Sequence, residues 1–256
     1  MSVSIAASWL LAIALCCVRV GMVLVMTPLL GGAQLPARVR LFLVLAVAVV
    51  FSPQLNVGLL TASGDVPFII LMSVNEVIWG ALMAFGLLCA FSAFMVAGRV
   101  LDLQIGFGLA TLIDPMTRNS APLLGVGLQM YGVVCFLAAD GHHLVIRALA
   151  RSWALIPLGA SPSDIPFERV FQHFGVMFTL GVVMASAVMV VLFLVDVGMA
   201  LGLRVLPQAN VFLLSIPVKI VTGMCVLALS MQYLGPVMKK IFSHAINYLD
   251  AVTAHP

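Results

Sequence analysis

Charged residues inside long apolar stretches of the chain are the first candidates for chemistry, because a charge there is energetically expensive. Arg19, Glu76 and Asp196 each have mostly aliphatic neighbours. A charged side chain at membrane depth usually faces protein or water, and it marks either an ion or proton pathway or a structural pair. No histidine or aspartate stands beside any of the three. We therefore interpret them as buried charges at subunit contacts, which pair with one another or with partner subunits.

A second group of chemically capable side chains is the pair His142 and His143 beside Asp140. Adjacent histidines on a helix are expected to point in different directions, so joint metal binding is not predicted. Asp140 instead suits the N-cap of a helix, with the histidines at an interface. The sequence contains no HExxH, P-loop or GxSxG motif. It therefore predicts no enzyme, no metal and no cofactor.

The cysteines give no further chemistry. All five lie in apolar stretches without CxxC spacing, and we expect buried free thiols that act as small hydrophobic residues. They are Cys16, Cys17, Cys89, Cys135 and Cys225.

The composition is that of an integral membrane protein. Of the 256 residues, 63% are hydrophobic and 8% are charged, against about 25% charged in a soluble domain. No polar linker divides the chain, so we expect one domain over residues 1–256. The net charge of +3 is scattered, which gives no footprint for nucleic acid. The N-terminus lacks a basic region, and it predicts a first spanning segment rather than a cleaved signal peptide.

About six apolar runs predict an all-α, polytopic fold of kinked hydrophobic helices. Most runs reach the length of about 20 residues that a membrane helix needs, and none alternates as a barrel strand would. Frequent prolines predict kinks, and basic residues divide equally between alternate loops, so the positive-inside rule gives no topology. Residues 239–249 predict an amphipathic interfacial helix. The runs are residues 3–30, 41–62, 66–98, 122–139, 175–203 and 211–235.

The stretch of residues 99–119, RVLDLQIGFGLATLIDPMTRN, separates two of these runs. Its glycines and proline disfavour a stable helix, although its middle is apolar. Arg99, Asp102, Asp114 and Arg118 stand near its ends. Two interpretations remain open: a connector that dips into the membrane interface, or an apolar segment held between charged anchors that packs into a cavity and moves.

Several short blocks, taken in order, resemble the FliR family of flagellar export proteins, which belongs with the T-type export proteins of virulence type III secretion systems. Each block is weak alone, but their order and spacing are specific. The blocks are TPLLG at 27–31, PARVRL at 36–41, DLQIG at 102–106 with DP at 114–115, DGH at 140–142, PLG at 157–159, LPQANVF at 206–212 and IPVK at 216–219.

The resemblance implies a place in a helical multi-subunit export-gate assembly of kinked hairpins. It implies FliP-type and FliQ-type gate subunits and an FlhB-type subunit as partners, with unfolded export substrates passing through the pore. A P-like N-terminal part would be followed by a Q-like hairpin at about residues 175–256. Membrane lipid would be the remaining contact, and the location would be the bacterial inner membrane, in the export apparatus of the flagellar basal body.

The resemblance also implies that the central loop is a pore plug. Family members often carry aromatic residues where this chain has leucines, but apolar side chains of either kind exclude water from a constriction. The implied plug residues are Gln104, Ile105, Gly106, Phe107, Gly108, Leu109, Leu112, Ile113, Asp114 and Pro115.

Two alternatives are weighed against the flagellar gate. One is a virulence injectisome subunit of the same family. The DGH block at 140–142 favours the flagellar subunit over this alternative. The other is a small polytopic transporter or ion channel that uses Arg19, Glu76 and Asp196.

Overall fold

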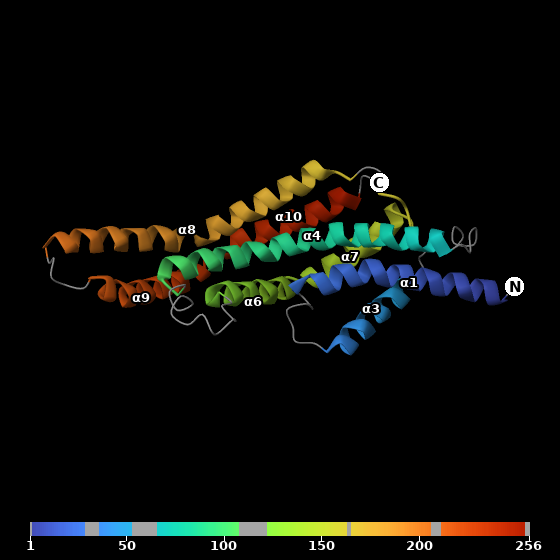
Figure 1. Ribbon diagram of the computed structural model, residues 1–256, viewed down its shortest axis with the longest axis horizontal. Coiled ribbons are helices and arrows are strands. Elements are labelled where there is room, and N and C mark those ends of the chain that lie inside the picture. Colours follow the sequence, from blue (N-terminus) through green and yellow to red (C-terminus); the bar gives the residue numbers. More distant parts are fainter. Residues whose placement is uncertain are drawn as a thin grey trace. The chain divides into compact units, whose positions relative to one another are not determined.

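The computed structural model of the chain is all-α, as the apolar runs predicted. The residues it describes contain eight helices and no strand. The described residues are 2–28, 36–52, 66–107, 122–162, 165–205 and 211–253. Figure 1 shows the helices, which are α1 (Ser2–Met26), α3 (Ala37–Phe51), α4 (Val66–Ile105), α6 (Leu123–Ala138), α7 (Gly141–Leu155), α8 (Phe167–Val205), α9 (Val211–Met231) and α10 (Gly235–Thr253).

Three of the described helices are long and apolar enough to cross a membrane, namely α1, α4 and α8. The number rises to five if two sharply bent pairs, α6 with α7 and α9 with α10, each count as one span. At 1.5 Å per residue, the 40 residues of α4 are about 60 Å long, twice the hydrocarbon thickness of a bilayer. The chain is therefore an integral membrane protein whose longest helix exceeds a single span.

The helix ends follow local chemistry. Helix α8 carries Glu168 in its first turn and Arg204 in its last, where each charge opposes the helix dipole. Helix α10 has Pro236 in its first turn, where a missing amide hydrogen does no harm. Helix α9 continues through Pro217.

The helix bounds differ from the predicted runs in several places. Helix α4 continues to Ile105, seven residues beyond the predicted end of its run at residue 98. Helix α7 falls in no predicted run, because His142, His143, Arg147 and Arg151 interrupt its apolar residues. Its N-cap residue is Asp140, as expected, although the Asp140 side chain makes no capping hydrogen bond.

The structure divides into two compact units, each assembled from distant segments of the chain. Unit 1 comprises residues 1–89, 136–174 and 244–256. Within it α1 and α3 pack against each other (Figure 1). Its apolar core includes Leu15, Cys16, Val20, Ala48 and Phe51. The predicted single export-gate domain, with P-like and Q-like parts, stays a prediction.

Unit 2 comprises residues 90–135 and 175–243. Its helices approach one another closely at glycines, which have no side chain to separate the backbones. A Cβ built on Gly98 of α4 would lie 2.4 Å from the Cα of Gly125 of α6, and one built on Gly181 of α8 would lie 2.7 Å from the carbonyl oxygen of Ala93. Small residues that let backbones touch are the usual means of packing membrane helices.

Helix α10 is amphipathic, as the sequence predicted for residues 239–249, but its apolar face is buried within the protein. Lys239 and Lys240 are exposed, whereas Ile241, Tyr248 and Leu249 are almost completely buried. The interfacial location was inferred from the pattern alone, and the pattern cannot distinguish a lipid surface from a protein surface.

The Gly98–Gly125 approach predicts different outcomes for two matched substitutions. Gly98→Ala forces a backbone shift, and we expect it to destabilise the chain by about 1–3 kcal/mol. Gly127→Ala on α6 meets nothing within 4 Å and should be neutral or stabilising by up to about 1 kcal/mol. Thermal unfolding in detergent measures both. Equal midpoints for the two variants would contradict the close packing of α4 on α6.

Candidate functional site

A buried ion pair joins α1 to α4 inside unit 1. Nε and Nη2 of Arg19 donate to the two carboxylate oxygens of Glu76, at 2.7 and 2.9 Å. Both side chains are completely buried. Nη1 of Arg19 donates to Oγ of Ser152 on α7 at 3.1 Å, and the Arg19 guanidinium carbon lies 5.7 Å from the Trp153 ring centroid. The guanidinium therefore links three helices at one point.

The carboxylate of Glu76 also fixes the turn that follows α7. The backbone N–H of Gly159 donates to Oε1 of Glu76 at 2.9 Å. The neighbouring Asn75 side chain donates to the carbonyl oxygen of Gly159, and Trp79 Nε1 donates to that of Ala160. Gly159 has a φ of 74°, and a Cβ there would lie 2.4 Å from Met72. Glycine is therefore required at this position.

The three predicted charges thus fall into two settings. Arg19 and Glu76 contact each other within one chain, while Asp196 of α8 pairs with Lys219 of α9 in unit 2. The Asp196 side chain is 43% exposed. A contact of any of them with another subunit stays a prediction. Sequence reasoning missed Ser152, Asn75 and Lys219 as partners, and the only signal for the turn was the PLG block at 157–159.

A second polar contact lies at the base of the predicted plug, inside unit 2. The buried carboxylate of Asp102, near the end of α4, accepts hydrogen bonds from the backbone N–H groups of Leu124 and Gly125 at 3.1–3.2 Å. These amides belong to the first turn of α6, where N–H groups have no partner within the helix. Asp102 therefore caps a different helix from its own, and holds together the two helix ends that flank residues 108–121.

The structure describes only the first plug residues. Gln104 and Ile105 end α4, and Ile105 is completely buried, with its side chain against Gly223 of α9. Gly106 has a φ of 103°, which glycine adopts without strain, and Phe107 follows it. The rest of the plug lies outside the described residues, namely Gly108, Leu109, Leu112, Ile113, Asp114 and Pro115. The plug assignment stays a prediction.

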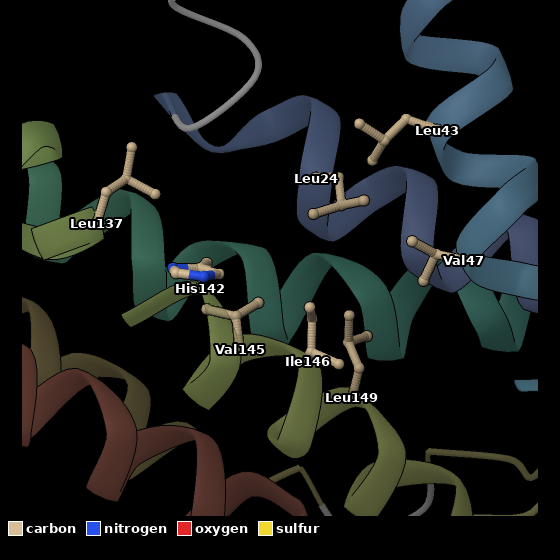
Figure 2. A pocket seen from close by; sticks show the side chains of 8 residues that line it. All are labelled: Leu24, Leu43, Val47, Leu137, His142, Val145, Ile146 and Leu149. Atoms are coloured by element: carbon tan, nitrogen blue, oxygen red, sulfur yellow. The ribbon is translucent and has the colours of Figure 1, made fainter. Parts of the chain in front are cut away.

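An apolar cavity of about 290 Å³ lies in unit 1 beside α1, α3 and α7. Figure 2 shows the imidazole of His142 among the aliphatic side chains that line it. Within the described part of the chain, Nδ1 of His142 is buried and has no hydrogen-bond partner. The cavity lining is Leu24, Leu43, Val47, Leu137, His142, Val145, Ile146 and Leu149.

The two adjacent histidines do not diverge as expected. The ring centroids of His142 and His143 lie 4.1 Å apart, with 37° between the ring planes. Nδ1 of His143 lies 3.3 Å from a carboxylate oxygen of Asp140. The premise that adjacent helical histidines point apart is wrong here, because the backbone sets only the direction of each Cα–Cβ bond and the side-chain torsions bring the two rings together.

The long apolar helices define an integral membrane protein, and a few buried charges lie between them. The chain matches the bacterial export proteins, family 1, over residues 10–245, and it belongs to this family.

Comparison with individual proteins gives the same family. The flagellar biosynthetic protein FliR of Escherichia coli K12 is 26% identical over 90% of this chain and 88% of its own length. FliR of Bacillus subtilis 168 is 27% identical over 93% of this chain and 92% of its own. The surface presentation of antigens protein SpaR of Shigella flexneri is 26% identical over 66% of this chain and 75% of its own. The resemblance to the FliR family is confirmed.

The ion pair predicts an asymmetry between single and double substitutions. Arg19→Leu leaves the Glu76 carboxylate buried without its partner, and we expect a loss of about 3–5 kcal/mol in unfolding free energy. The double variant Arg19→Leu, Glu76→Met removes both charges and should lose less than Arg19→Leu alone.

Chemical denaturation in detergent measures these losses, with Asp196→Asn as the control. Because the Asp196 side chain is 43% exposed whereas Glu76 is completely buried, this change should cost less than Arg19→Leu. A double variant at least as unstable as Arg19→Leu would mean that the pair contributes net stability.

Proposed function

We propose that this chain is a non-enzymatic subunit of the flagellar type III protein export gate. In this function it forms a pore with FliP-type and FliQ-type subunits, is contacted by an FlhB-type subunit, and passes unfolded export substrates. The gate lies in the bacterial inner membrane, in the export apparatus of the flagellar basal body. The observation that carries the proposal is the family match over residues 10–245.

The extent of the matches favours the flagellum over the injectisome. The flagellar relatives of Escherichia coli and Bacillus subtilis cover 90% and 93% of this chain, whereas SpaR of Shigella flexneri covers 66%. The injectisome subunit remains the second candidate because the identities are nearly equal.

The geometry of the ion pair favours a structural role over ion or proton transport. Both oxygens of Glu76 are occupied by Arg19, and one also accepts the N–H of Gly159. A carboxylate that carries ions or protons needs access to water, but Glu76 is completely buried. This arrangement supports a rigid scaffold in unit 1 rather than a transport site.

The hydrogen bonds of Asp102 are consistent with a plug loop whose two ends are held in place. A plug has to be anchored at its base and apolar in its middle, so that it seals without leaving the pore. Asp102 supplies the anchor through two amides of α6, and residues 105–113 supply the apolar sequence. Gly106, with its positive φ, gives the chain a change of direction directly after α4.

Co-expression tests the gate assignment. The full chain, expressed with the FliP-type and FliQ-type proteins of the same bacterium, should purify as one complex. Recovery of the chain alone, as a stable monomer under conditions that preserve membrane complexes, would overturn the proposal.

Substitution of leucines tests the plug. In the assembled complex, Leu109→Ser with Leu112→Ser should allow ions to leak across vesicles, because a wetted constriction conducts. Deletion of residues 109–113 should leak more. Leu103→Ser is the matched control, since Leu103 is a 71% exposed leucine of α4 that precedes the plug. Intact assembly with no leak in either plug variant would return residues 108–121 to the role of a connector.

A further inference from the structure

We propose that Asp140, His142 and His143 form a binding site for a divalent transition-metal ion of the zinc class. One ligand atom from each side chain is available, and the three atoms lie within 4.8 Å of one another. All three residues belong to unit 1, at the start of α7. The proposal does not depend on the export function.

The spacing fits metal coordination. With metal–ligand bonds of about 2.0–2.1 Å, two ligands of a tetrahedral site are about 3.3 Å apart. Nδ1 of His143 and Oδ1 of Asp140 are already 3.3 Å apart. No separation between the three ligand atoms exceeds 4.8 Å. Two of the three side chains are largely exposed, 76% for Asp140 and 60% for His143.

The backbone brings the three side chains to one place. Asp140 adopts a left-handed conformation with φ of 56°, which non-glycine residues seldom adopt and aspartate tolerates better than most. Gly141 follows, and a Cβ there would lie 2.3 Å from the Phe136 ring, so this turn accepts only glycine. The first turn of α7 is thereby held close to Phe136, with His142 and His143 directly after it.

The donor set selects the class of ion. Two imidazole nitrogens and one carboxylate oxygen suit Zn²⁺, Co²⁺, Ni²⁺ and Cu²⁺, whereas Mg²⁺ prefers oxygen ligands alone. Nδ1 of His142 has no hydrogen-bond partner among the described residues, so no protein group there competes for it. The N-terminal end of α7 disfavours a cation, and the Asp140 carboxylate offsets this effect. Three protein ligands leave a fourth position for water.

Metal retention tests the site directly. The full chain, purified without a histidine tag, is equilibrated with Zn²⁺ and dialysed, and the bound metal is measured. We expect one equivalent of Zn²⁺, competition by Co²⁺ and none by Mg²⁺. Asp140→Asn and His143→Ala should each lower the Zn²⁺ affinity tenfold or more. Both positions are largely exposed, so the variants should keep the thermal unfolding midpoint of the metal-free parent.

His244→Ala provides the matched control, because His244 is an exposed histidine of α10 outside the cluster. It should bind Zn²⁺ like the parent. At the same Zn²⁺ concentration, the unfolding midpoints of the parent and of His244→Ala should rise by more than that of Asp140→Asn. Absence of retained Zn²⁺, equal retention in all variants, or loss of Zn²⁺ in His244→Ala would each overturn the proposal.

Discussion

The ion pair of Arg19 and Glu76 is the constraint on which unit 1 depends. Removing two charges from water costs several kcal/mol per ion, and the attraction between them repays this only when the remaining hydrogen-bonding groups are also satisfied. Here they are, because Ser152 and the amide of Gly159 complete the network. The network therefore requires α1, α4 and α7 to take one register, since a shift of one residue would separate the pair.

In unit 2, the buried carboxylate of Asp102 likewise fixes the position of neighbouring helices through hydrogen bonds. Apolar contacts between membrane helices are weakly directional, because lipid tails are as apolar as the side chains they replace. A buried carboxylate that accepts two amides specifies position and orientation together. The close approach of Gly98 to Gly125 supplies the van der Waals contact beside it. In both units a few polar groups decide which helices pack, and small or aliphatic residues then fill the space.

The sequence predicted the fold class and most helices, because runs of 20 or more apolar residues have few other solutions. It missed α7 as a run, since the charged and histidine residues of one face hide the buried positions Val145, Ala148 and Leu149. It could not assign the partners of Arg19, because Glu76 lies 57 residues away and the second partner, Ser152, comes from α7. It misjudged the histidine pair, since the direction of a Cα–Cβ bond does not determine where an imidazole ring lies.

The exposed apolar surface constrains the environment in which the chain is stable. Of the three candidate spans, α4 is the most buried and α8 the least. Along α8, Phe167, Phe171, Phe174 and Phe178 recur at the spacing of one helix face and are all more than half exposed. Such a face is unstable in water and requires lipid or protein over it. Buried polar pairs thus determine the packing within the chain, whereas α8 offers surface to whatever surrounds it.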